Sequence, residues 1–366
     1  MRLNIFLIIT LGFLFRLFVS FWNGYFGPSL GAELDALSFH SEAVSLLGEP
    51  MFSNLRTGWI YASFLSCFYS LTIPSLFLGS LLSVIFWLFS ALVLYKITEL
   101  FMMTKIQSFW VLTIFSLMPS SILFTSITLR EAYEILFINI SLYSFFKIYL
   151  TNKFRYYVLA MFCIFLSSKL HIALLIPTCS LLFFAILLRL SKKATFNLAI
   201  FIIFLFILFA ILFSVESLEE YYFNLHQAVS DFRFRATTIE ARANFISQSE
   251  LDRSFNINNI PNYFLLYMTQ PFPWHLNLFL DFGVMIENLI RLLLLFSSFI
   301  SLFKLQGDRK KIIFVLLTTY LLTEAIWAIG SLNYGTAIRH HLVSLGLLSI
   351  ISLSYIKNKS TINRIA

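Results

Sequence analysis

Charged residues are scarce in this sequence of 366 residues. Asp, Glu, Lys and Arg together make up 12% of the chain, about half the share that is usual in a water-soluble domain. Hydrophobic residues make up 59%, and 44 residues are Phe. Because so few charges cannot cover a soluble surface, this composition excludes a water-soluble protein. It indicates an integral membrane protein.

Cysteine is also rare, with three residues in the whole chain. Cys67, Cys163 and Cys179 each lie within an apolar segment, and no two of them have the CxxC spacing of a metal or redox site. An odd number of isolated cysteines does not suggest a disulfide framework. We expect these side chains to pack as small core hydrophobes, and we predict no metal ion and no other cofactor.

Long apolar segments recur along nearly the whole chain. A helix of about 20 apolar residues spans the roughly 30 Å of hydrocarbon in a bilayer, and such a helix satisfies its own backbone groups there. The sequence therefore predicts an all-α, polytopic transmembrane helical bundle of about ten helices, in a single integral membrane domain covering residues 1–366. The expected spans are 3–22, 75–96, 106–124, 131–150, 156–170, 172–190, 197–214, 283–303, 312–330 and 341–356.

The lysines indicate how this bundle is oriented. If both termini are cytoplasmic, eleven of the twelve lysines fall on the cytoplasmic side and only Lys169 falls on the outer side. An excess of lysine in short cytoplasmic loops is the positive-inside pattern. It accounts for the net charge of +8 without a nucleic-acid partner. This orientation requires that the semi-apolar segment 57–72 lies along the outer surface and does not cross.

The outer side then carries the long polar segments. We expect long outer loops with interfacial helices, at about residues 23–74, 119–131, 215–282 and 331–341. Nearly all of their cations are arginine, whose planar guanidinium pairs with phosphate or carboxylate through two parallel hydrogen bonds. These arginines are Arg56, Arg130, Arg233, Arg235, Arg242, Arg253 and Arg339. Recognition or chemistry is therefore expected on the outer side of the membrane.

Four short motifs lie in these loops. The motif "GAELDALSFHSEA" contains the acids Glu33 and Asp35, and "NLRTGWIYASFLSCFYS" covers the non-crossing segment. The motif "PSSILFTSITLREA" contains Arg130 and Glu131, and "NYGTAIRHH" contains Arg339. This layout resembles the GT-C type of polytopic membrane glycosyltransferases and the related bacterial polymerases of O-antigen and capsular polysaccharide (Wzy-type).

The resemblance implies glycosyl transfer on the outer, periplasmic face of a bacterial inner membrane. The sugar donor would be linked to a polyprenyl phosphate or pyrophosphate, such as undecaprenyl phosphate, and would enter from the lipid bilayer. The expected role is in cell-surface polysaccharide assembly, as a polymerase of repeat units such as those of lipopolysaccharide O-antigen. Other polysaccharide-assembly proteins are possible partners.

Three alternatives stay open beside the polymerase. One is a transferase that adds a single sugar from a polyprenyl monophosphate, the second is a flippase or transporter of lipid-linked sugars, and the third is a non-catalytic scaffold. Metal-dependent members of the family often have a second acid where this chain has Arg130 beside Glu131. This departure gives a further reason to expect no metal ion.

The candidate catalytic residues are Glu33, Asp35, Arg130 and Glu131. Transfer needs a base for the acceptor hydroxyl and positive charge for the departing phosphate. Glu33 or Asp35 is the candidate base, and a solvated or helix-capping carboxylate is the structural alternative. Arg130 is the candidate phosphate clamp, and the alternative is an ion pair with Glu131 or Glu134.

The candidate substrate-binding residues come from several segments. Arg339 and His340 are expected in a glycine-containing turn that an anion can approach closely, with a snorkelling helix end as the alternative. The other candidates are His40, Lys169, His171, Arg233 and Arg235. Together with the catalytic residues they are expected to converge on one outward-facing cleft. There an arginine should lie within about 10 Å of an acid from the first loop.

Charge inside the predicted helices is sparse and consists mainly of Arg16, Glu287, Arg291 and Glu324. Glu287 and Arg291 are four residues apart and are predicted to pair with each other. Glu324 has no partner nearby in the sequence and is expected to face the interior of the bundle. Because charge at helix centres is otherwise sparse, the sequence favours an enzyme over a transporter.

Overall fold

A computed structural model describes residues 2–27, 33–49, 59–190, 260–276, 279–331 and 334–355. Every regular element within these ranges is a helix, and seven of the helices there are long and apolar enough to cross a membrane. The prediction of an all-α membrane bundle is therefore confirmed for these residues. The count of about ten helices and the side on which the termini lie remain predictions. The predicted span 197–214 lies outside the described residues.

The first half of the described chain forms eight α-helices. In chain order they are α1 (Arg2–Tyr25), α2 (Glu33–Ser45), α3 (Trp59–Ser70), α4 (Leu76–Leu100), α5 (Lys105–Leu117), α6 (Pro119–Phe124), α7 (Glu131–Thr151) and α8 (Phe154–Leu170). The elements that follow are η1 (Ile172–Leu174), α9 (Leu175–Leu190), α13 (Ile260–Thr269), η4 (Pro273–His275), α14 (Phe279–Lys304), α15 (Gly307–Gly330) and α16 (Tyr334–Leu353).

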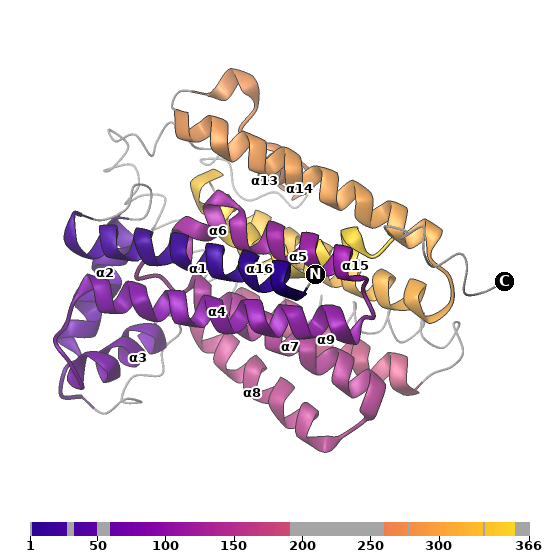
Figure 1. The fold of residues 1–366 in the computed structure, drawn as a ribbon, viewed down its shortest axis with the longest axis horizontal. Helices are drawn as coiled ribbons and strands as arrows, with labels where there is room; N and C mark the ends of the chain where they lie inside the picture. Colours follow the sequence, from indigo (N-terminus) through magenta and orange to yellow (C-terminus); the bar gives the residue numbers. More distant parts are fainter. Residues whose placement is uncertain are drawn as a thin grey trace.

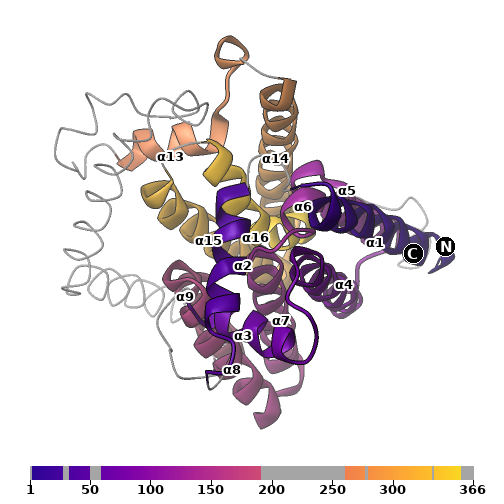
Figure 2. The same cartoon turned by 90° about the vertical axis from the view of Figure 1, so that its left-hand side faces the viewer.

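The long helices lie side by side, and α2 and α3 lie at one end of them (Figure 1). A view onto this end, which we call the α2/α3 end, shows α2 and α3 in front of the bundle (Figure 2). Helix α3 has 12 residues and is about 18 Å long, which is too short to cross a bilayer. This length agrees with the expectation that segment 57–72 does not cross.

Lysines collect at the opposite end of the bundle. Lys96 lies near the end of α4 and Lys105 begins α5, whereas Lys304 ends α14. Figure 1 shows these helix termini on the side away from α2 and α3. By contrast, Lys169 lies in the last turn of α8, which returns toward the α2/α3 end. The described part of the chain thus separates its lysines by end, as the orientation argument requires.

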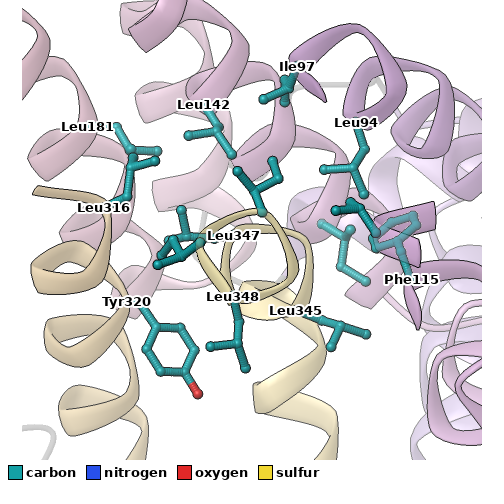
Figure 3. Close-up of a cluster of buried hydrophobic side chains, with 14 of the residues drawn as sticks. Leu94, Ile97, Phe115, Leu142, Leu181, Leu316, Tyr320, Leu345, Leu347 and Leu348 are labelled. Carbon is teal, nitrogen blue, oxygen red and sulfur yellow. The ribbon is translucent and has the colours of Figure 1, made fainter. Parts of the chain in front are cut away.

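Helix α16 forms the centre of the bundle. Every residue from 341 to 350 is buried, because α16 packs against α5, α7, α14 and α15. A helix that is enclosed on all sides must be apolar all round. Figure 3 shows Leu345, Leu347 and Leu348 pointing from α16 in different directions, and Leu94, Leu142 and Leu316 of three other helices lie around this helix. Any polar side chain on α16 therefore needs a partner from a neighbouring helix.

One predicted span is broken in the structure. We expected a single helix over 106–124, but α5 ends at Leu117 and α6 begins at Pro119. Pro119 is the cause, because a proline has no backbone N–H and clashes with the preceding turn. Arg16 of α1 donates to the Ser116 carbonyl at 2.8 Å, at the end of α5. Glu287 of α14 accepts from the Ser120 backbone N–H at 2.7 Å, at the start of α6.

The predicted pairing of Glu287 with Arg291 is wrong. The two Glu287 carboxylate oxygens accept hydrogen bonds from the backbone N–H and the hydroxyl of Ser120. No ion pair joins Glu287 to Arg291 within the described residues. The first turn of α6 offers two donors, and a carboxylate is favoured at the positive end of a helix. The break between α5 and α6, at the start of the predicted outer loop 119–131, therefore decides where Glu287 points.

The predicted outer turn 331–341 is largely helical. Helix α16 begins at Tyr334, so Arg339 and His340 lie in its second turn and not in a glycine-containing turn. Successive residues of an α-helix point about 100° apart. The run Arg339, His340 and His341 is therefore directed toward three different neighbours of α16.

Candidate functional site

Arg339 joins two carboxylates from distant parts of the chain. Its Nε donates to Oε1 of Glu131 at 2.7 Å, and its Nη2 lies 2.6 Å from the same oxygen. Its Nη1 binds Oδ2 of Asp35. Asp35 belongs to α2 and Glu131 begins α7. The expected proximity of an arginine to an acid of the first loop is therefore met by direct contact.

The two carboxylates differ in exposure. The Glu131 side chain is 5% exposed and that of Arg339 is 14% exposed, whereas that of Asp35 is 53% exposed. Burial makes the Glu131 contact hard to replace by water, because an uncompensated buried charge is costly. An exposed carboxylate contributes little by pairing and separates easily. Glu131 thus fixes Arg339 in place, and Asp35 is the partner that can leave.

Arg130 and Glu134 lie beside this contact. Arg130 Nε is 3.2 Å from Glu134 Oε1, and Nη1 donates to the Leu170 carbonyl at 3.3 Å. The structural alternative for Arg130, a pair with Glu134, is therefore present. We call Asp35, Arg130, Glu131, Glu134 and Arg339 the Arg339 cluster. In it, three carboxylates face two guanidinium groups.

One buried carboxylate oxygen in the Arg339 cluster has neither a hydrogen bond nor an ion-pair contact among the described residues. Both contacts from Arg339 to Glu131 fall on Oε1, and Glu131 Oε2 is buried with no hydrogen-bond partner in the structure. A buried carboxylate oxygen without a donor is unfavourable. A hydroxyl or amide group of a ligand would supply the missing donor.

His171, Trp327 and His340 form an aromatic group near the Arg339 cluster. The rings of Trp327 and His340 stack with centroids 3.8 Å apart, and the His171 ring lies 4.5 Å from that of Trp327. His340 Nδ1 is 2.7 Å from the Ser331 hydroxyl. Burial, and to a smaller extent the charge of Arg130, lower the pKa of His171 to about 3. The His171 imidazole is therefore neutral at ordinary pH.

His40 ties α2 to α3. Its Nδ1 lies 2.9 Å from the hydroxyl of Tyr69, and burial lowers its pKa. We expected His40 to orient an acceptor or to tune Asp35, but its contact in the structure is with Tyr69. By fixing α3 under α2, His40 holds in place the helix that carries Asp35.

The remaining candidate residues are not brought into the Arg339 cluster by any described contact. Lys169 makes no ion pair with a described residue and lies in the last turn of α8, where a cation interacts favourably with the helix dipole. Glu33 begins α2, but its side chain is outside what the structure describes. Arg233 and Arg235 also lie outside the described residues. Their predicted roles stay predictions.

Sequence reasoning missed a pair of buried residues deeper in the bundle. His341 Nδ1 lies 2.5 Å from Glu324 Oε2, and the Ser344 hydroxyl donates to Glu324 Oε1. Glu324 is fully buried, so the expectation that it faces the interior is correct. The available signal was a histidine and a glutamate within two consecutive apolar helices, but nothing in the spacing showed that they meet.

No metal site is evident in the residues that the structure covers, because no group of three or more His, Cys, Asp or Glu side chains is placed there to hold an ion. Comparison with known proteins identifies no relative: no family model, no curated protein and no solved structure matches the chain.

Proposed function

We propose that this chain transfers a sugar from a polyprenyl-linked phosphate or pyrophosphate donor, at a site built around the Arg339 cluster. The supporting observation is that Arg339 draws together acids from two segments about a hundred residues apart, Asp35 and Glu131. For each of these residues taken singly, the structural alternative is a helix cap or a snorkelling arginine. Neither alternative requires the three residues to lie close together. A transferase must bring a base and a phosphate-binding cation into one place.

The different exposure of the two acids gives them different roles. Glu131 positions the guanidinium of Arg339 from its buried side. Asp35, which is half exposed, binds the Nη1 edge, and a phosphate of the donor competes for that edge because arginine forms parallel hydrogen bonds with phosphate as well as with carboxylate. Binding of the donor therefore frees Asp35 next to the bound phosphate.

The freed Asp35 acts as the general base. It takes the proton of the acceptor hydroxyl, the acceptor oxygen bonds to the anomeric carbon, and the bond from that carbon to the phosphate oxygen breaks. The electron pair of that bond stays on the departing phosphate, where Arg339 stabilises the charge. Arg130 stands beside this position and is the second cation available to a pyrophosphate. No metal ion is needed for this sequence of steps.

The setting at the α2/α3 end suits a lipid-linked donor. Large apolar side chains such as Phe18, Phe21 and Trp22 are exposed along α1 and would contact lipid. The polyprenyl chain would remain in the bilayer while its phosphate reaches the Arg339 cluster. Our proposal places this end on the outer, periplasmic face of a bacterial inner membrane, in assembly of surface polysaccharide. Polymerisation of repeat units and addition of a single sugar share this chemistry.

Purified protein in liposomes with a lipid-linked sugar tests the proposal. We expect Asp35→Asn to lower the rate of transfer by a factor of about 10² or more, while donor binding is retained or increased. Glu49→Gln is the matched control, because Glu49 lies just after α2 and is exposed. Transfer by Asp35→Asn at the wild-type rate would refute the role of Asp35. The length of the product separates a polymerase from a single-sugar transferase.

A flippase of lipid-linked sugars is the second candidate, and two observations favour it. The α5–α6 segment is broken within the bundle, and discontinuous helices are typical of transporters. Arg16 and Glu287 are also buried inside helices, and both contact the interrupted α5–α6 segment. Movement of a lipid-linked sugar across liposomes by Asp35→Asn, without any transfer product, would favour this candidate.

A further inference from the structure

A second polar cluster lies deeper in the bundle than the Arg339 cluster. It consists of Tyr267 of α13, Arg291 of α14, Glu324 of α15, and His341 and Ser344 of α16, and we call it the His341 cluster. Each of these side chains belongs to a residue that is at most 4% exposed. None of them takes part in the proposed transfer. Ionisable groups inside a membrane bundle are costly, so a functional role is the first hypothesis for them.

The contacts of His341 indicate which of its two ring nitrogens carry a hydrogen. Its Nε2 lies 3.2 Å from the backbone carbonyl oxygen of Tyr267, and a carbonyl oxygen only accepts hydrogen bonds. Nε2 therefore carries a hydrogen. Its Nδ1 lies 2.5 Å from Glu324 Oε2, and two bare lone pairs would repel each other at this distance. One further proton must therefore lie between His341 and Glu324.

Two donors around this pair are unused. Arg291 Nη2 and the Tyr320 hydroxyl are buried and have no hydrogen-bond partner among the described residues, whereas the Tyr267 hydroxyl already lies close enough to Glu324 to interact with its carboxylate. Arg291 interacts electrostatically with Glu287 first, and then with Tyr320, Glu324 and Tyr267. It is not within ion-pair distance of any described carboxylate. Unsatisfied buried donors require an explanation, and both could bind a carboxylate that is no longer occupied by His341.

We propose that Glu324 and His341 form an intramembrane proton-binding site, which holds one proton in the present arrangement and releases it when Glu324 turns to the unused donors. On release, the N–H bond to Nδ1 breaks and the proton passes to water as hydronium. His341 becomes neutral, and Glu324 stays a carboxylate that Arg291 and the tyrosine hydroxyls stabilise. The charge of Arg291 stabilises the proton-free state inside the bundle, because it compensates the negative charge of Glu324.

The groups around the pair are consistent with two states. Glu287 of α14 is held at Ser120, and on α7 the carboxylates Glu131 and Glu134 are occupied by Arg339 and Arg130. Arg291 therefore lies between two carboxylates, Glu287 and Glu324, and it forms an ion pair with neither of them among the described residues. The titratable and charged groups facing the site from the packed elements are Tyr267 of α13, Glu287 and Arg291 of α14, Tyr320 and Glu324 of α15, and His340 of α16.

Nitrogen NMR of histidine side chains tests this proposal directly. Full-length protein labelled with ¹⁵N-histidine in nanodiscs would be titrated with acid and base, and the His341 signal would be assigned by its loss in His341→Gln. We expect a doubly protonated ring at low pH that loses the Nδ1 proton and keeps the Nε2 proton as the pH rises. Absence of a protonated-carboxyl infrared band at low pH would show that the shared proton lies on His341 and not on Glu324. His171, which is half-buried and neutral at ordinary pH, serves as the internal reference.

Two variants make the assignment specific. Arg291→Gln removes the cation that balances the proton-free state, so the midpoint of the His341 transition should move up by about one pH unit or more. Arg291→Lys, which keeps the charge, should move it less. The control is Arg155→Gln, which changes an exposed arginine of α8 and should leave the midpoint unchanged. Glu324→Gln should remove the transition, because an amide does not share the proton.

Two results would overturn the proposal. One is a His341 signal that keeps a single proton on Nε2 and a bare Nδ1 throughout the pH range in which the protein is folded. The other is a proton that never leaves in that range, or that leaves at the same pH in Arg291→Gln as in the wild type. Neither result depends on sugar transfer, so the site can fail while the proposed function stands.

Discussion

At the scale of single residues, exposure separates side chains that share one partner. Asp35 and Glu131 both bind the guanidinium of Arg339, yet Asp35 is half exposed and Glu131 is almost fully buried. An exposed pair contributes roughly 0–1 kcal/mol to stability. Removal of one member of a buried pair leaves the other charge without compensation. The two acids should therefore differ in what they do for folding and for chemistry.

The first prediction compares these two acids. Glu131→Gln should lower the free energy of unfolding by about 2–3 kcal/mol, because Arg339 loses its buried counter-charge. Asp35→Asn should change it by less than about 1 kcal/mol. Thermal or denaturant unfolding of the purified protein in detergent measures both values. Equal loss of stability in the two variants would contradict the division into a positioning acid and an exchangeable acid.

The second prediction concerns His171. An unfolded histidine takes up a proton near pH 6.5, whereas burial and the charge of Arg130 lower the pKa of folded His171 to about 3. The unfolded chain therefore binds more protons between these values, so lowering the pH through this window favours unfolding. The loss is at most about 1.4 kcal/mol for each pH unit.

His171→Asn isolates this contribution. An asparagine side chain can still accept the hydrogen bond that His171 Nδ1 receives from the Ala173 N–H at 3.2 Å, but it does not titrate. The thermal midpoint of this variant should fall less steeply with acid than that of the wild type. Parallel pH profiles for the two proteins would show that His171 is not the source.

Residue partners are the part of the site that sequence predicts least well. The convergence of Asp35, Glu131 and Arg339 was expected because one reaction needs them together. The pairing of Arg339 with both acids was not, since it depends on how α2, α7 and α16 are rotated. A shift of one residue on a helix turns a side chain by about 100°. The same limit explains why Glu324 was expected to be buried but its partner His341 was not found.

At the scale of helices, the interrupted α5–α6 segment is held from both sides. Arg16 donates to carbonyl oxygens of Gly12 and Ser116 and to hydroxyls of Ser121 and Thr125. Its guanidinium also lies 3.6 Å from the ring centroid of Trp87. Arg16 is fully buried, and within the described residues no carboxylate pairs with it. The free carbonyls at the end of α5 take the place of a carboxylate.

The third prediction is that Arg16→Lys destabilises the bundle. A lysine keeps the charge but has one compact ammonium group, which cannot replace the planar set of donors and the stacking on Trp87. We expect the free energy of unfolding to fall by about 2–3 kcal/mol. Arg155→Lys, at an exposed arginine of α8, is the matched control and should have little effect. A stable Arg16→Lys variant would mean that charge alone holds the segment.

Sequence predicted the helices well where apolar runs are continuous. The expected spans 3–22, 75–96, 131–150 and 283–303 lie within or overlap α1, α4, α7 and α14. The sequence did not predict that the span 106–124 divides into α5 and α6, because apolar residues continue on both sides of Pro119. It also failed at 331–341, where glycine and polar residues suggested a turn. Packing of α16 against four helices supports a helix there despite its local sequence.

At the scale of the whole molecule, the separation of lysines predicts which end is accessible from outside. In a protein whose Cys67, Cys163 and Cys179 have been replaced, single cysteines would be introduced at Ser41 or Thr151, both of which are exposed. Ser41 belongs to α2, and Thr151 ends α7 at the opposite end. A membrane-impermeant reagent applied to intact cells should label Ser41→Cys and not Thr151→Cys. Labelling with the reverse pattern would invert the orientation.

The position of α16 has a mechanical consequence. Arg339, His340 and His341 are consecutive, yet they hold α7, α15 and α13 in three directions around one axis. These contacts fix the rotation of α16 about its own axis. A rotation that breaks one of the three contacts must also strain the other two. If a single side chain leaves its contact, the other two contacts still hold the helix in the same orientation. A rotation of α16 would therefore disturb the Arg339 cluster and the His341 cluster together.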